Sequence, residues 1–297
     1  MKIDLHIHST NSDGTKTTQE LLNDLLNLGA SIISFTDHDN VDCYKDLEDL
    51  HFGSNDLEII PGVELCFVQD GALRDVLGYG IDYHKMSCWL EDKYSLTNRI
   101  NKQRAILDRF KKICRNKGLL FDSSIDVVSG KKSEAFVVMY NELNKYEENK
   151  KKLPFITNNT RFYWDYFANK SSDFYVSETD GLPTMKEAIA SIHNAGGLAF
   201  MAHPCAYRMP YEKVECFLNE GIANGINGIE VQHSSNINND RQFLESYAKK
   251  NNLLISGGSD FHGATKPGLM LINGYNNINI TYEEISPWVD KIAHFKL

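Results

Sequence analysis

Two histidines one residue apart, His6 and His8, lie in the first apolar stretch of the chain. In a β-strand alternate side chains share a face, so both imidazoles would point the same way. Ile3, Leu5 and Ile7 would then point the other way, into a core. Two imidazoles on one face at a strand end suit a metal ion. An H-x-H pair also arises by chance, so the pair by itself is weak evidence.

Histidines and carboxylates recur where later apolar segments end. They are Asp37, His38 and Asp39 after residues 31–35, Glu64 after 59–63, His203 after 198–202, Glu230 and His233 around 228–231, and Asp260 and His262 after 254–258. Each one alone is more often a satisfied core histidine or a solvated carboxylate. In a (β/α) barrel, however, the carboxyl ends of all strands meet on one face, where the active site lies. Their recurrence therefore predicts one shared site.

The chemistry of the shared site follows from its ligand types. Imidazole and carboxylate without thiolate suit Mn, Fe or Zn in a catalytic role, not a structural zinc site. Close metal ions need a bridging carboxylate, and Glu64 is the natural choice. We expect two or three divalent ions, which would lower the pKa of a bound water and neutralise phosphate oxygens.

The elements that must position these residues alternate between strand and helix. Thr17 and Glu20 have capping-box spacing before a helical run that Gly29 ends, and Thr184 and Glu187 repeat the pattern. This rhythm over residues 1–85 and 183–297 predicts parallel strands, with residues 76–81 as one of them.

Residues 86–182 differ, because they are rich in Lys, Asn, Glu and Tyr and show amphipathic helical stretches around 96–114 and 135–146. We expect an inserted, mostly helical cap subdomain. The aromatic cluster over 162–167 could stack a nucleobase, but the core of the insert is the favoured role.

Bulk composition excludes several classes of protein. The net charge of −9 over 297 residues argues against a dedicated duplex nucleic-acid binder, which neutralises phosphates with basic surface. The N-terminus lacks the pattern of a secretory signal, and no apolar run reaches the length of a membrane span. The six scattered cysteines suit free thiols in a reduced compartment, so we expect a cytoplasmic protein with no membrane partner.

Six motifs together give the sequence a family resemblance. They are His6-Ile7-His8, Ser12-Asp13-Gly14, Thr36-Asp37-His38-Asp39, Pro61-Gly62-Val63-Glu64, Ala202-His203-Pro204 and Gly258-Ser259-Asp260-Phe261-His262. In this set the chain resembles the polymerase and histidinol phosphatase (PHP) superfamily. The resemblance implies a distorted (β/α)₇ barrel with up to three metal ions. By position, His6, His8, Glu64 and Asp260 would hold the first ion, Glu64 and His203 the second, and Asp13, His38 and His262 the third.

Two segments depart from the family pattern. Many relatives have a His before the L-G-Y segment as a ligand of the second ion, and here Asp75 occupies that place. A carboxylate can still bind Mn or Fe. The nucleotide phosphatases that the chain most resembles carry a G-R-P-H-like segment, and its His is absent around residues 129–135.

A phosphate also needs basic partners, and arginine forks match its geometry. Arg99 and Arg104 lie on the helix that opens the insert, where a solvated helix face is the alternative. Lys266 and Arg208 are further candidates, next to His262 and His203.

The sequence thus predicts a hydrolase that cleaves a phosphate monoester by attack of a metal-bridging hydroxide on phosphorus. Asp37 or His233 could protonate the leaving oxygen, although His233 could instead orient the substrate. The resemblance implies a small phosphorylated substrate, a nucleoside 3′,5′-bisphosphate or the 5′ end of a short oligonucleotide. Two alternatives stay open: a histidinol-phosphate-type phosphatase, and a non-catalytic PHP module. The sequence leaves the oligomeric state open.

Overall fold

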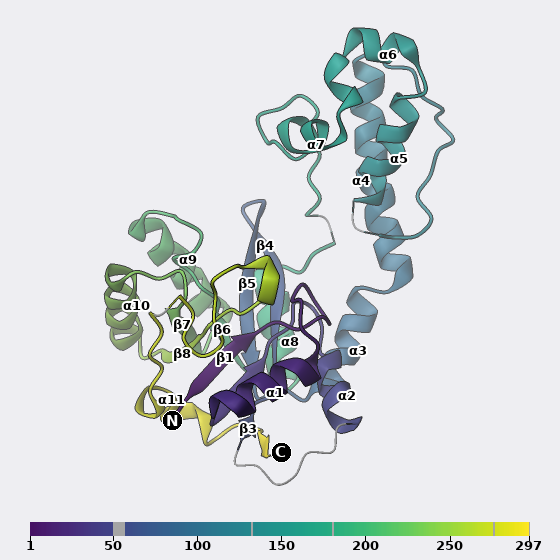
Figure 1. Ribbon diagram of the computed structural model, residues 1–297. Coiled ribbons are helices and arrows are strands. Elements are labelled where there is room, and N and C mark those ends of the chain that lie inside the picture. Colours follow the sequence, from purple (N-terminus) through teal and green to yellow (C-terminus); the bar gives the residue numbers. More distant parts are fainter. Residues whose placement is uncertain (50–56, 132, 180, 276, 297) are drawn as a thin grey trace. The chain divides into compact units, whose positions relative to one another are not determined.

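The computed structural model describes residues 1–49, 57–131, 133–179, 181–275 and 277–296. The chain divides into two compact units (Figure 1). The main unit comprises Met1–Leu90 and Pro183–Leu297, and the inserted unit comprises Glu91–Leu182.

The strands of the main unit form two sheets. The first has the order β1 (Ile3–Ile7), β2 (Ile32–Phe35), β3 (Glu58–Ile59) and β9 (Phe295–Lys296), and the second has the order β4 (Gly62–Gln69), β5 (Ala72–Tyr79), β6 (Leu198–Met201), β7 (Gly228–His233) and β8 (Leu254–Gly258). Pairing is parallel along β1–β2–β3 and β6–β7–β8. It is antiparallel along β4–β5–β6 and between β3 and β9.

The expectation of parallel strands is therefore wrong for β5, which runs antiparallel to both of its neighbours, β4 and β6. A two-residue turn joins β4 to β5, with Asp70 at φ 50° and Gly71 at φ 67°. An Asp-Gly pair with both φ values positive is a strong hairpin signal, and it reverses the chain between β4 and β5. The predicted strand over 59–63 also divides into β3 and the start of β4, so Glu64 lies inside β4 and not after a strand.

The two sheets approach each other at two junctions. At the β1–β8 junction, Asp260 N–H donates to His6 O (2.8 Å) and His8 N–H donates to Phe261 O (2.9 Å). At the β2–β4 junction, Asp39 N–H donates to Glu64 O (2.9 Å). Over the described ranges the strand order nevertheless forms two sheets and no closed barrel. The α/β class is confirmed, and the seven-stranded barrel is not.

Two helices of the main unit, α1 (Thr18–Leu28) and α8 (Met185–Asn194), begin at the predicted caps. The others are α2 (Asp42–Asp49), α3 (Tyr83–Lys93, which runs across the unit boundary), α9 (Tyr211–Asn224), α10 (Asn238–Asn251) and α11 (Tyr282–Val289), with a 3₁₀ turn at Gly263–Thr265. Thr17 and Thr184 form the expected capping boxes, and Gly29 ends α1 in the left-handed conformation at φ 72°. The core includes Ile3 and Leu5, so β1 buries the face that the alternation predicted.

The described part of the inserted unit contains helices and turns without a strand. They are α4 (Leu96–Asn116), α5 (Glu134–Leu143), α6 (Glu147–Lys152), a 3₁₀ turn (Pro154–Thr157), α7 (Asn159–Arg161) and a π-helical turn (Phe162–Phe167). Phe162 and Phe167 are fully buried in this unit's own core, whereas Trp164 is 66% exposed. The aromatic cluster is therefore mainly core. None of the described helices, including the 21-residue α4, is long and apolar enough to cross a membrane.

Candidate metal centre

Four buried side chains bring one ligand atom each to a common point. His6 Nε2 lies 3.1 Å from His8 Nε2, 3.1 Å from Glu64 Oε2 and 3.5 Å from Asp260 Oδ1. His8 Nε2 lies 3.2 Å from Glu64 Oε2 and 3.3 Å from Asp260 Oδ1. For metal–ligand bonds of about 2.0–2.1 Å, the edge of a coordination tetrahedron is roughly 3.3 Å. The spacing of these atoms therefore fits a single transition-metal ion.

Glu64 connects this group to two more histidines. Its Oε2 lies 3.3 Å from His38 Nδ1, and its Oε1 lies 2.9 Å from His203 Nε2. The carboxylate is fully buried on β4. One of its oxygens faces His6, His8 and His38, and the other faces His203. This is the geometry that a carboxylate bridging two close ions requires.

Asp75 faces the same side of the β4–β5 hairpin as Glu64. Cys66 is paired with Asp75 and lies two residues from Glu64, so the pleat puts both carboxylates on one face. Asp75, Glu64 and His38 form one of the groups that could hold an ion. Burial raises the pKa of Asp75, and the charge of Glu64 raises it further. A cation between the two carboxylates would relieve that repulsion.

A third group lies at the more exposed side of the cluster. His8, Asp13, His38 and His262 could jointly hold an ion. Asp13 Oδ1 lies 3.2 Å from His262 Nε2, and Asp13 Oδ2 lies 4.0 Å from His38 Nε2. All nine predicted ligands thus lie in one cluster of the main unit.

Two ligand positions have an unusual backbone. His203 has φ 26° and Asp260 has φ 57°, in the left-handed region that disfavours residues other than glycine. Such conformations persist where the surrounding structure fixes them, and they are frequent at functional sites. Glu230 helps to fix the cluster, because its Oε1 lies 2.8 Å from His6 Nδ1 and its Oε2 accepts a hydrogen bond from His203 N–H (2.9 Å). A carboxylate behind a ligating imidazole holds the ring in orientation.

The charges within the cluster are mutually dependent. Burial alone would lower the pKa of His8, but hydrogen bonds to Asp260 and Glu64 raise it to about 9. Burial likewise disfavours charge on His203, yet contact with Glu64 raises its pKa to about 9. Conversely, burial raises the pKa of Glu64 and of Asp260, but nearby histidines bring both well below the ordinary value. The raised pKa values of His8 and His203 favour protonated rings, so a metal ion bound by these two residues would displace protons.

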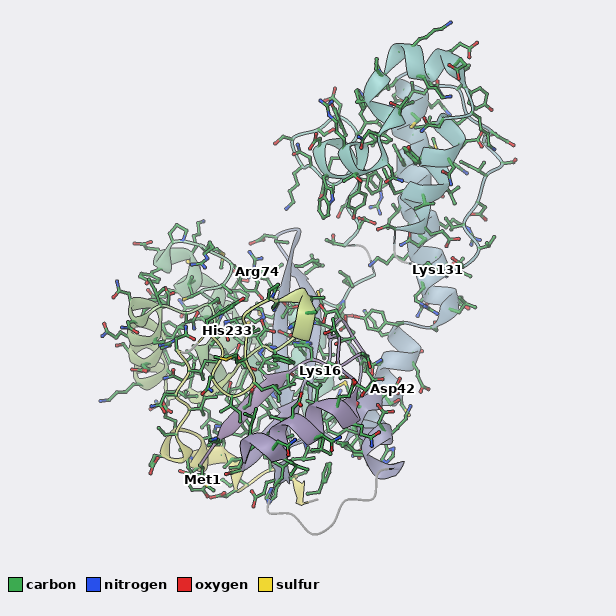
Figure 2. The ribbon with its side chains drawn as sticks, viewed as in Figure 1. Met1, Lys16, Asp42, Arg74, Lys131 and His233 are labelled. Atoms are coloured by element: carbon green, nitrogen blue, oxygen red, sulfur yellow. The ribbon has the colours of Figure 1, made fainter. Side chains whose placement is uncertain are left out.

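The two predicted proton donors lie in different surroundings. Asp37 is fully buried, and its oxygens accept hydrogen bonds from Ser9 N–H (2.7 Å), Ser9 Oγ (2.7 Å) and Ser12 Oγ (2.5 Å). Its carboxylate thus holds the turn after β1 and does not line the pocket over the cluster. His233, labelled in Figure 2, does line that pocket, with Nε2 3.2 Å from Asp260 Oδ2. This geometry favours His233 for a role toward substrate.

The predicted phosphate-binding residues do not all lie together. Lys266 lines the pocket over the cluster, with Nζ 2.5 Å from Asp260 Oδ2. Arg208 lines a different hollow, beside Tyr211. Arg99 and Arg104 belong to α4 of the inserted unit, where Arg104 makes a two-pronged ion pair with Asp126 (Nη2–Oδ2 2.9 Å).

The pocket over the cluster, about 470 Å³ in volume, contains residues that the sequence did not indicate. Tyr207 Oη donates to Asp75 Oδ2 (3.1 Å) and accepts from Asp75 N–H (2.9 Å), so it orients that carboxylate. Tyr275 is 50% exposed and presents an aromatic ring at the pocket wall. Neither residue belongs to a motif. Only the position of Tyr207 four residues after His203 could have drawn attention to it.

The fold and the cluster together define a metal-dependent hydrolase of α/β class. The family model of the PHP domain matches residues 4–295. The chain therefore belongs to the PHP domain family, and the predicted metal-dependent phosphoesterase is confirmed at that level.

Known relatives span nearly the whole chain. A 5′-3′ exoribonuclease of Haemophilus influenzae is 28% identical, over 88% of this chain and 90% of its own length. A 3′,5′-nucleoside bisphosphate phosphatase of Chromobacterium violaceum is 23% identical, over 90% of this chain and 89% of its own. A solved structure described as a metal-dependent phosphoesterase of Bifidobacterium adolescentis is similar in fold, with a TM-score of 0.60, 22% identity, and 98% and 96% of the two chains covered.

Proposed function

We propose that the protein hydrolyses a phosphate monoester on a nucleotide, either a nucleoside 3′,5′-bisphosphate or the 5′ end of a short oligonucleotide. The observation that carries the proposal is the convergence of four imidazoles on the two oxygens of Glu64, beneath a pocket with a single lysine. The names of the Haemophilus influenzae and Chromobacterium violaceum relatives support the nucleotide part.

Two or three divalent ions fit the cluster. His6, His8, Glu64 and Asp260 would hold one, Glu64, Asp75 and His203 a second, and Asp13, His38 and His262 a third. Mn, Fe or Zn held there would activate a water molecule as nucleophile and neutralise phosphate oxygens. Glu64 would serve as the bridge, and Glu230 would keep His6 in its ligating orientation.

Residues around the ions would hold and protonate the substrate. The Lys266 ammonium can move from Asp260 to a phosphate oxygen, since its side chain is 38% exposed. His233 faces the same pocket and would give a proton to the leaving oxygen, with Ser235 Oγ 2.8 Å from its other ring nitrogen. Both residues lie next to Asp260 Oδ2, so a phosphate bound there would meet a positive charge and a proton donor together.

A substrate panel tests this proposal. We expect the Mn²⁺-loaded protein to release phosphate from a nucleoside 3′,5′-bisphosphate or a 5′-phosphorylated dinucleotide with kcat/KM at least about tenfold above that for histidinol phosphate or an aryl phosphate. Asp260→Ala serves as the control for contaminating phosphatases. Preference for histidinol phosphate would overturn the nucleotide assignment, and absence of all turnover would favour a non-catalytic module.

A second prediction concerns the arginines of α4. The sequence left Arg99 and Arg104 open as phosphate-binding residues, and of the two we propose Arg99, because Arg104 would first have to give up its ion pair with Asp126. Charge-assisted contacts contribute about 1.5–3 kcal/mol, so Arg99→Ala should lower kcat/KM by roughly ten- to a hundred-fold. The loss should fall on KM if the phosphate is a non-reacting one, and on kcat if it is the one transferred.

Arg104→Ala on the same helix is the matched control for this substitution. We expect it to stay within about threefold of wild type on the same nucleoside 3′,5′-bisphosphate. Equal rates for the Arg99 variant and wild type would show that Arg99 is ordinary surface charge. Lys266 would then be the next residue to replace.

A further inference from the structure

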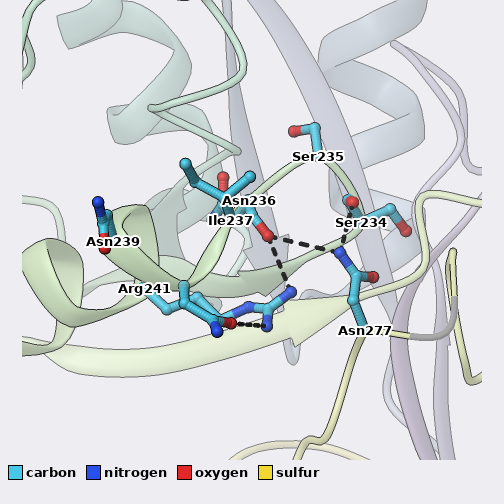
Figure 3. Close-up of a pocket in the computed structure, with 8 residues that line it drawn as sticks. Ser234, Ser235, Asn236, Ile237, Asn239, Arg241 and Asn277 are labelled. Atoms are coloured by element: carbon cyan, nitrogen blue, oxygen red, sulfur yellow. Dashed lines mark hydrogen bonds between the residues drawn. The ribbon is translucent and has the colours of Figure 1, made fainter.

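A second pocket, whose lining residues are drawn in Figure 3, shares two residues with the pocket over the metal cluster. Ser234 and Ser235, directly after β7, line both. Residues Ser234–Asn239, with Arg241 and Asn277, form the second pocket, which has a volume of about 480 Å³. We call it the amide pocket. Both pockets lie in the main unit, so a ligand at the metal cluster could extend into it.

The chemistry of the amide pocket is neutral and polar. Four asparagines line it, no carboxylate does among the described residues, and Ile237 presents an apolar side chain that is 60% exposed. Its one cation is partly engaged with the protein, because Arg241 Nη2 donates to Asn236 O (2.9 Å) and Nη1 lies 3.5 Å from Asn238 Oδ1. The buried Arg241 Nε has no acceptor among the described residues, so a ligand with an acceptor atom as well as N–H donors suits this pocket. These contacts favour an uncharged ligand with polar edges over a second phosphate.

The orientation of two of these amides is fixed by the backbone. Asn236 Nδ2 donates to Val231 O (2.8 Å), and Asn277 Nδ2 donates to Ser234 O (2.9 Å), as Figure 3 shows for the latter. Because the backbone carbonyls of Val231 and Ser234 can accept only from Nδ2, the Oδ1 atom of each amide points away from its carbonyl. The loop is thus held in shape before any ligand arrives.

The oxygens of these two amides lack donors. Asn236 is fully buried, and neither its Oδ1 nor that of Asn277 has a hydrogen-bond partner within the part of the chain that the structure describes. A buried acceptor without a donor is uncommon in folded proteins and calls for an external partner. The partner must supply N–H groups, because both atoms are acceptors.

We propose that the amide pocket binds the nucleobase of the substrate and favours bases with an exocyclic amino group, namely adenine, cytosine and guanine, over uracil. An exocyclic amino group brings two N–H donors for the two oxygens, Asn277 Oδ1 and Asn236 Oδ1, whereas uracil brings only its N3–H. The base ring packs on Ile237. This inference rests on the proposed function, since it is the metal cluster that holds the phosphate of the same nucleotide.

The first test uses the unaltered, Mn²⁺-loaded protein. We expect KM for adenosine 3′,5′-bisphosphate to be roughly tenfold below that for uridine 3′,5′-bisphosphate, as for one discriminating hydrogen bond. Equal values within about twofold would overturn the inference and leave the proposed function standing. If neither nucleotide is hydrolysed, the proposed function fails. The base preference is then tested by calorimetry: a Kd for adenosine 3′,5′-bisphosphate roughly tenfold below that for uridine 3′,5′-bisphosphate supports it, and values within about twofold contradict it.

The second test removes the acceptor. Asn277→Leu keeps the size of the side chain but removes the acceptor together with the Nδ2 donor to Ser234 O, so the adenosine-to-uridine preference should fall to about one. Asn277→Asp loses the same donor but keeps an acceptor, and it should keep the preference. Asn279→Leu, an exposed asparagine two residues away, is the matched control and should keep the full preference. If the adenosine-to-uridine preference survives in Asn277→Leu, another residue discriminates between the bases and the inference is contradicted.

Discussion

Glu64→Gln is expected to lower kcat/KM by at least about 10³-fold. Removing a group behind a metal ligand costs 10–100-fold, and Glu64 would ligate directly and to more than one ion. Its two oxygens approach His6, His8, His38 and His203 within 2.9–3.3 Å. Glutamine keeps the shape, but it offers one neutral oxygen and turns an N–H₂ group toward the imidazoles.

Steady-state kinetics, elemental analysis and a thermal melt check this prediction together. We expect the variant to lose at least one bound ion per chain and to keep a cooperative melt. Glu212→Gln, on the exposed start of α9, is the matched control and should behave as wild type. A Glu64 variant with wild-type turnover and metal content would remove Glu64 from the centre.

Stripping the metal is the second large effect that we expect. Chelation should reduce turnover by more than about 100-fold, and Mn²⁺ should restore it, because the proposed nucleophile is a water that the ions activate. Protein purified without chelator should carry at least two divalent transition ions per chain. An ion present at 100 times its Kd stabilises the folded state by about 2.7 kcal/mol, so the melting temperature should rise by several degrees on reloading.

Metal analysis and calorimetry with and without Mn²⁺ measure both effects. His203→Ala and Asp260→Ala should abolish turnover and reduce the metal-dependent rise in melting temperature. After treatment with chelator, both variants should melt near the temperature of chelator-treated wild type, which shows that their fold is intact. Full turnover in excess chelator, with no ion detected and none rebound, would contradict a metal-dependent reaction.

Part of the cluster could be predicted from the sequence because two of its residue pairs follow from strand geometry. His6 and His8 share a face of β1 by simple alternation, and Asp260 and His262 follow β8 with the same spacing. Each residue needs only its own short segment to be read correctly. The capping boxes were predictable for the same reason, since they involve contacts three residues apart.

Other features depend on contacts that no short segment contains. The direction of β5 depends on the turn at Asp70-Gly71. The apolar run of a strand does not show whether the strand pairs in parallel or antiparallel. Asp37 has the type and place of a catalytic acid, yet Ser9 and Ser12 occupy its oxygens. Tyr207 is joined to Asp75 only through the folded hairpin, so its role could not be predicted from spacing.

The β1–β8 junction also sets the order in which the molecule can assemble. Asp4 accepts a hydrogen bond from Ser259 N–H across 255 positions of the chain, so the two ends must meet before His6 and Asp260 can converge. During synthesis from the N-terminus, the inserted unit is complete before that partner strand exists. Contacts of such long range form slowly, and the free edge of β1 stays open to other chains meanwhile. A newly made chain therefore acquires its catalytic activity late. A chain that ends before residue 259 would keep the ligands of five motifs but would lack Asp260 and His262, and with them the complete metal centre.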